Sequence, residues 1–140
     1  MLPTNVQEFV TKNHLASFST LRGNGGMQLS LVLAGPFQEG AAFSTPGDRA
    51  KYKNLLRNPK CSLLVSTRDW FSGYVVLEGQ ARVMDASNTE PAALSSALRD
   101  VYRATADAEH PDWEEFDQAM RDERRAVIVV VPESIYGTAV

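Results

Sequence analysis

The residues best suited to hold a ligand lie at the junction between a predicted strand and a predicted helix. Ser44 and Thr45 end the strand, Pro46-Gly47-Asp48 makes a turn, and the helix opens with Arg49-Ala50-Lys51. A helix N-terminus offers free N–H groups and a positive dipole end, and arginine binds phosphate in a bidentate way. The glycine spacing and Lys-Ser/Thr pair of a Walker loop are absent. The junction therefore predicts a cradle for a phosphate or carboxylate, and the alternative is an ordinary solvated helix face.

Charge is segregated along the chain, which narrows the class of ligand. Residues 1–84 carry nine Lys/Arg against five Asp/Glu, whereas residues 85–123 carry three against eleven. A compact cationic patch in a protein of net charge -3 favours a discrete anionic ligand. Nucleic acid is not expected as a partner, because no broad basic surface exists and the acidic stretch would repel phosphates. The patch consists of Arg49, Lys51, Lys53, Arg57 and Lys60.

Length and composition exclude several other classes of protein. The 140 residues fit a single domain, 1–140, and the 44% hydrophobic and 22% charged residues are typical of a folded globular chain. No apolar run approaches the ~18 residues of a membrane span, and the first residues lack the features of a signal peptide. We therefore expect a cytoplasmic protein without a membrane partner. One cysteine and two distant histidines also argue against a metal site.

Hydrophobic periodicity predicts a mainly β, α+β fold. Asn24-Gly25 favours a hairpin turn between the first two strands, and Gly79 within a long strand indicates a bulge or bend. Gly35-Pro36 is expected to end the second strand. Short turns between the strands and helices in the longer connections favour a small, six-stranded antiparallel barrel. The predicted strands are 15–21, 27–33, 41–45, a segment around 61–65, 74–84 and 126–131, and helices are predicted near 5–13, 49–57, after 88–91 and around 113–120.

Several segments together resemble a known family. They are His14-Leu15-Ala16-Ser17-Phe18-Ser19-Thr20, Phe43-Ser44-Thr45, Lys51 with Asn54-Leu55 and Asn58-Pro59, Glu78-Gly79-Gln80-Ala81, and Arg124 to Ile128 with Pro132-Glu133 and Tyr136-Gly137. In this order they are similar to the split β-barrel flavin and deazaflavin oxidoreductases, the pyridoxamine 5′-phosphate oxidase-like superfamily. The resemblance is strongest to the branch that uses the deazaflavin coenzyme F420, and it spans nearly the whole chain.

The resemblance implies a six-stranded split β-barrel with Greek-key topology and a homodimer with coenzyme sites in the grooves between subunits. It implies a phosphate bound at the junction, polar contacts from the second strand, and aromatic residues lent by the partner subunit. Flavin-type rings stack well on such aromatic side chains. The coenzyme-binding residues implied are Gln28, Ser30, Ser44, Thr45, Arg49, Ala50, Lys51, Asn54, Trp70 and Tyr74.

The implied activity is an oxidoreductase in which F420H2 gives a hydride to an electron-poor small molecule. FMN is the alternative coenzyme, and a non-catalytic carrier of a cofactor or haem is an alternative from another class. A purely structural homodimer would leave the basic patch unexplained. No paired carboxylates or Ser-His-Asp set is found, so Tyr74, Ser30 and a bound water are the candidates for proton delivery.

The chain departs from the family at one hairpin. There the family commonly reads Asp-Gly-Arg-Pro, whereas this chain has Gly25-Gly26-Met27 after Asn24. No contact from a hairpin arginine is therefore expected, and this departure favours the carrier alternative.

Overall fold

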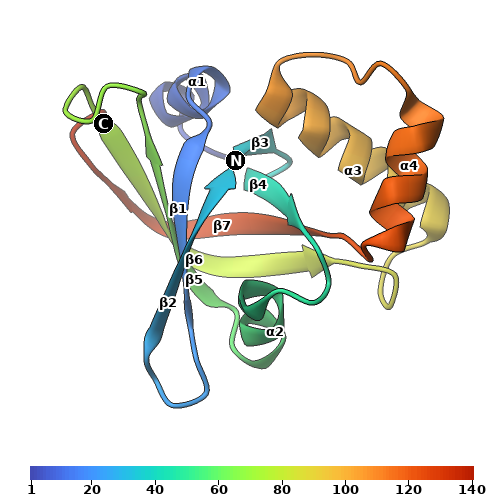
Figure 1. Cartoon of the computed structure of the whole chain (residues 1–140). Helices are drawn as coiled ribbons and strands as arrows, with labels where there is room; N and C mark the ends of the chain where they lie inside the picture. The colour runs from blue at the N-terminus through green and yellow to red at the C-terminus, as the bar shows by residue number, and fades with distance from the viewer.

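The computed structural model describes residues 1–140 as one antiparallel sheet with four helices around it. The sheet runs in the order β2-β1-β5-β6-β7-β4-β3 and curls into an open half-barrel (Figure 1). Its strands are β1 (Leu15–Leu21), β2 (Met27–Leu33), β3 (Gly35–Phe37), β4 (Gly40–Thr45), β5 (Lys60–Ser66), β6 (Tyr74–Met84) and β7 (Ala126–Tyr136). The helices are α1 (Thr4–Lys12), α2 (Ala50–Arg57), α3 (Pro91–Ala106) and α4 (Trp113–Asp122). None of the four combines the length and apolar character needed to cross a bilayer.

The expected fold class is confirmed, but the predicted count of six strands is wrong by one. Gly35-Pro36 does not only end β2; it opens the three-residue strand β3, which pairs with β4 through Pro36 and Ala41. Proline is compatible with this position because β3 is the last strand of the sheet, so the missing N–H of Pro36 removes no ladder hydrogen bond. The last strand also extends beyond the predicted 126–131, to Tyr136.

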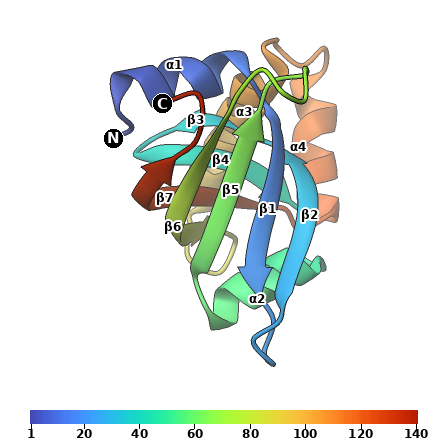
Figure 2. The same ribbon diagram turned by 90° about the vertical axis from the view of Figure 1, so that its left-hand side faces the viewer.

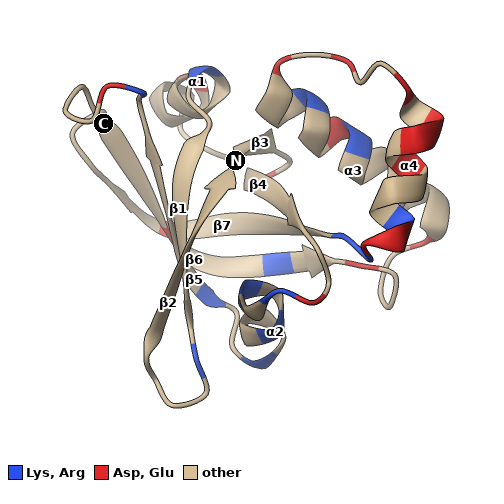
Figure 3. Cartoon of the chain, in the orientation of Figure 1, with Lys and Arg blue, Asp and Glu red and all other residues tan.

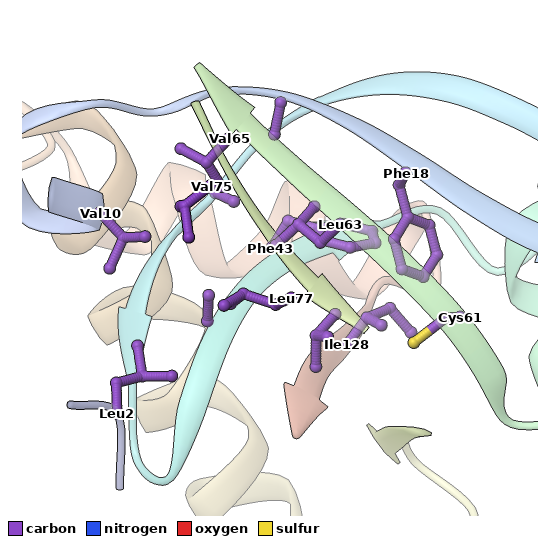
Figure 4. Close-up of a cluster of buried hydrophobic side chains, with 14 of the residues drawn as sticks. Leu2, Val10, Phe18, Phe43, Cys61, Leu63, Val65, Val75, Leu77 and Ile128 are labelled. Atoms are coloured by element: carbon purple, nitrogen blue, oxygen red, sulfur yellow. The ribbon is translucent and has the colours of Figure 1, made fainter. Parts of the chain in front are cut away.

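Strand β7 is buried on both faces, and this burial divides the core in two. Ala126, Ile128 and Val130 point into the half-barrel, while Val127 and Val129 point toward α3 and α4. All five residues have an exposed fraction of 0%. Inside the half-barrel, the rings of Phe18 and Phe43 meet edge to face with centroids 4.7 Å apart, near Leu63, Leu77 and Ile128 (Figure 4). The apolar run in the sequence thus reflects a strand shared by both clusters.

Strand β2 presents its most apolar face to solvent. Its side chains alternate, and Gln28, Ser30 and Val32 on the other face are the more buried. No helix crosses the outer surface of β2, β1 and β5, which is turned to the viewer in Figure 2. Contiguous exposed apolar side chains of this kind are typical of surfaces that contact another molecule. The row consists of Met27, Leu29, Leu31 and Leu33, exposed by 66, 66, 87 and 54%.

The bulge predicted at Gly79 is confirmed. The pairing of β6 with β7 changes register between Glu78 and Gly79. A Cβ atom at Gly79 would lie 2.2 Å from the carbonyl oxygen of Val131 and 2.8 Å from the amide nitrogen of Glu133. The two strands therefore approach too closely at this point for any side chain.

We predict that Gly79→Ala lowers the free energy of unfolding by about 2–3 kcal/mol, since backbone atoms must move to admit the methyl group. Gly23→Ala is the matched control, because a Cβ atom there would meet only the Arg57 side chain, at 3.6 Å. Urea unfolding of both variants measures the difference, and equal stabilities would contradict the close approach at the bulge.

Candidate functional site

The residues predicted at the β4–α2 junction line a cavity of about 540 Å³. One wall comes from Ser44, Thr45 and Pro46 at the end of β4, with Arg49 and Lys51 at the start of α2. Leu31, Val32 and Leu33 of β2 border it, and α3 and α4 close the other side. The cavity therefore lies between the half-barrel and the helices that cover β7.

Three cations meet on the junction wall: Arg49, Lys51 and Arg125. Arg49 forms an exposed ion pair with Asp48, at 3.1 Å. Lys51 has no carboxylate partner within ion-pair distance. Burial lowers the pKa of Lys51 below the ordinary lysine value of 10.5, and the charges of Arg49 and Arg125 lower it further. The wall thus holds an excess of positive charge that an anion would neutralise.

Arg125 is the member of this wall that sequence analysis did not include. Its Nη1 atom donates to Ser44 Oγ at 3.0 Å, and its Nε atom donates to Glu123 at 3.0 Å. Arg125 reaches Ser44 because β7 pairs with β4, Val127 opposite Ser44 and Ala126 opposite Thr45. The sequence shows two arginines before a strand, but not which strand lies beside it.

Most of the predicted phosphate-binding residues are brought together. Ser44, Thr45, Arg49 and Lys51 all line the cavity, and Ala50 begins α2 between the two cations. Thr45 is buried, with an exposed fraction of 1%. Figure 3 shows several Lys and Arg residues on and beside α2, and acidic residues concentrated on α4 and the segments next to it.

Helix α2 is fixed to the sheet by hydrogen bonds on two sides. The Asn54 amide donates to Thr20 Oγ1 at 3.1 Å, and the Thr20 hydroxyl donates to Gln28 Oε1 at 3.3 Å. On the other side, the Tyr52 hydroxyl donates to Asp85 at 2.7 Å, and this bond raises the pKa of Tyr52 to about 12. Gln28 and Asn54 therefore join β2, β1 and α2 and do not line the cavity. These contacts hold the helix that carries Lys51.

The three remaining predicted residues also lie outside the cavity of a single chain. The Ser30 hydroxyl is buried without a hydrogen-bond partner. Tyr74 begins β6, while the cavity lies near the opposite end of that strand, where Met84 pairs with Val127. Trp70 stands in the β5–β6 loop with 80% of its surface exposed. Ser30 and Tyr74, the residues suggested for proton delivery, thus do not face the cavity within one subunit.

The helical wall supplies polar groups that sequence analysis did not assign to the site. Tyr102 and Thr105 of α3, His110 of the connecting segment and Glu115 of α4 all line the cavity. The rings of Tyr102, His110, Trp113 and Phe116 pack together, with centroids 5.2–5.8 Å apart. Spacing along α4 predicts the packing of Trp113 and Phe116, but nothing in the sequence places His110 at the cavity.

Comparison with known proteins gives one family match and several similar structures. The family model described as pyridoxamine 5′-phosphate oxidase matches residues 2–139. A conserved hypothetical protein of Mycobacterium tuberculosis, Rv2991, is similar with a TM-score of 0.79 and 19% identity, over 98% of this chain and 84% of that one. A protein described as an F420 reductase is similar with a TM-score of 0.66 and 22% sequence identity. The match covers 96% of this chain and 98% of that one. A haem-binding protein of Mycobacterium smegmatis is similar with a TM-score of 0.68 and 17% sequence identity. The match covers 99% of this chain and 55% of that one.

We predict that the affinity of the cavity for inorganic phosphate falls as pH rises through the alkaline range toward the ordinary lysine pKa of 10.5. A bound dianion raises the pKa of Lys51, so binding is strongest while Lys51 is protonated in the free protein and weakens above its lowered free-state pKa. Calorimetric titration at several pH values measures this fall.

Two variants serve as controls for that titration. Lys51→Arg keeps its charge throughout the range and should lose the fall. Lys53→Arg should retain it, since Lys53 does not line the cavity. A fall that persists in Lys51→Arg would show that another group titrates.

Proposed function

Because the chain belongs to the pyridoxamine 5′-phosphate oxidase family, we propose that it is an oxidoreductase that binds a phosphate-bearing redox coenzyme in the cavity. The proposed coenzyme is F420, with FMN as the alternative, and the proposed substrate is an electron-poor small molecule. A likeness to one F420 reductase supports the fold and, at 22% identity, does not assign the coenzyme.

The observation that carries the proposal is the unneutralised charge at Lys51. A phosphate between Lys51, Arg49 and Arg125 would supply the missing anion, and Ser44 Oγ lies beside Arg125 as a further polar contact. Charge-assisted hydrogen bonds of this kind are stronger than neutral ones. The donor set therefore fits the phosphate that F420 and FMN share.

The chain's own residues would bind and orient the coenzyme, which supplies the hydride chemistry when bound. The cationic wall would fix its phosphate, and Leu31, Val32 and Leu33 would provide an apolar border that keeps water from the ring. F420 also carries carboxylates beyond its phosphate, and Lys53 on α2 adds an exposed positive charge two residues after Lys51. This added positive charge near the junction favours F420, the more negatively charged coenzyme, over FMN.

A second candidate function is a carrier that binds a cofactor or haem without turnover. It is favoured by the altered hairpin at Gly25-Gly26-Met27 and by the absence of paired carboxylates in the cavity, where Glu115 is the single acidic residue. The absorption spectrum of the purified protein, followed by titration with F420 and with FMN, separates the possibilities. Tight binding of FMN with no affinity for F420 would overturn the first choice, and binding without reduction of any acceptor would favour the carrier.

We also propose that the chain forms a homodimer through the exposed apolar row on β2. Leu31 and Leu33 belong to this row and also border the cavity, so a second copy seated there would complete the coenzyme site. The β5–β6 loop presents Trp70 and Phe71 with exposed fractions of 80 and 91%. Its turn is held by Asp69, which accepts from Ser72 Oγ at 2.5 Å. Such exposed aromatic side chains suit a role at the partner's site.

Arg49→Ala, Lys51→Ala and Arg125→Ala should each weaken coenzyme binding by about 1.5–3 kcal/mol, typical of hydrogen bonds to charged groups. Fluorescence titration with F420 and FMN measures the loss. Lys12→Ala, on helix α1, is the matched control, because Lys12 does not line the cavity, and it should bind as the unmodified chain does. Unchanged affinity in all three cavity variants would mean that the patch is only a solvated surface.

Met27→Glu combined with Leu29→Glu should convert the dimer to monomers, because two carboxylates would be buried at an apolar interface. Neither residue lines the cavity at the junction. Light scattering after size-exclusion chromatography measures the mass. Leu56→Glu, at an exposed leucine of α2, should leave the dimer intact, and a monomeric unmodified chain would refute the proposed assembly.

A further inference from the structure

The helical wall of the cavity differs in chemistry from the cationic wall. Tyr102, His110 and Phe116 form an aromatic surface there, with Met120 beside them as an apolar neighbour. Its polar groups are the Thr105 hydroxyl, the His110 imidazole and the Glu115 carboxylate. No lysine or arginine of α3 or α4 lines this cavity. An anion bound at Lys51 would thus leave a separate, less polar space along this wall.

His110 is held in place on several sides. Its ring centroid lies 5.2 Å from that of Tyr102, 5.3 Å from that of Phe116 and 5.7 Å from that of Trp113. Its Nδ1 atom accepts a hydrogen bond from the Asp112 amide at 3.0 Å. Asp112 in turn accepts from the Glu115 amide at 3.1 Å and so caps α4. The imidazole is therefore part of the structure that begins this helix.

The contact with Asp112 fixes which nitrogen of His110 carries the proton. A nitrogen that accepts a hydrogen bond has no proton of its own, so the neutral ring bears its proton on Nε2. The chain provides no acceptor for this N–H, because His110 makes no other hydrogen bond. His14 differs, since both of its ring nitrogens lie 2.8 Å from acceptors, Ala34 O and Asp107 Oδ2. His110 is thus the histidine with a donor to offer.

We propose that the helical wall is a subsite for an uncharged planar molecule whose carbonyl or nitro oxygen accepts a hydrogen bond from His110 Nε2. Glu115 is the single carboxylate at the cavity and would repel a second anion, while the aromatic rings favour a flat ligand. The inference rests on the proposed function, since the cationic wall is taken to hold the coenzyme phosphate, and it adds the class of substrate. In this role His110 polarises the ligand oxygen by donating a hydrogen bond to it. The proton stays on Nε2 and need not be transferred to the ligand.

Three ligands with the same ring system test this subsite: 2-acetonaphthone, 2-ethylnaphthalene and 2-naphthoate. They differ in having a carbonyl acceptor, no acceptor and a negative charge. The titrations are run in phosphate buffer, so that the cationic wall is occupied. Nitrogen-detected NMR of the imidazoles reports binding, because the chain has only two histidines and His14 serves as an internal control.

We expect 2-acetonaphthone to shift the His110 signals, to leave those of His14 unchanged, and to bind about 3- to 10-fold more tightly than 2-ethylnaphthalene, the effect of one neutral hydrogen bond. His110→Phe keeps a ring in the aromatic cluster and should remove this preference. His110→Gln retains an N–H donor and should preserve part of it. 2-Naphthoate should bind more weakly than the ketone and gain affinity in Glu115→Gln.

Equal affinities for the ketone and the hydrocarbon, or an undiminished preference in His110→Phe, would overturn the subsite. Shifts of equal size at both histidines would also overturn it, since they would indicate binding elsewhere on the surface. Its failure is distinguishable from that of the proposed function. If the protein binds F420 or FMN but 2-acetonaphthone does not shift the His110 signals, only the subsite proposal is refuted. If the protein binds 2-acetonaphthone at His110 but neither coenzyme, the proposed function is refuted.

Discussion

Burial of β7 on both faces is the constraint on which the rest of the structure depends. A strand whose first five residues are completely buried needs apolar partners on each side. The half-barrel provides one side, and α3 with α4 provides the other. The same strand pairs with β4, and this pairing brings Arg125 to Ser44. The cavity is therefore a consequence of the way in which one apolar strand is covered.

The predicted site residues that the fold brings together are those that lie close together in sequence. Ser44, Thr45, Arg49 and Lys51 lie within one strand-turn-helix segment, so local patterns suffice to bring them together. Arg125 depends on a strand pairing across more than 80 residues, which no local pattern contains. His110 was missed for a related reason, since its position follows from how the two helices pack on β7.

The alternation along β2 shows a different limit of sequence patterns. It correctly predicts a strand with leucines on one face and polar residues on the other. It does not tell which face is covered within the same chain. Here the polar face is turned inward, where Gln28 contacts Thr20, and the leucines are left outside. Alternating leucines normally indicate the face of a strand that packs into the core. In β2 other residues fill the interior, and the leucines form the proposed contact between two copies of the chain.

The two walls of the cavity come from separate parts of the chain. The cationic wall is built from the β4–α2 junction and Arg125, whereas the aromatic wall belongs to an excursion that begins after β6 and ends before β7. Strands β6 and β7 pair directly, so the sheet's hydrogen bonding is complete without this excursion. The helical segment can therefore vary in sequence without disturbing this strand pairing as long as it still covers Val127 and Val129, and the proposed phosphate site on the other wall would be kept.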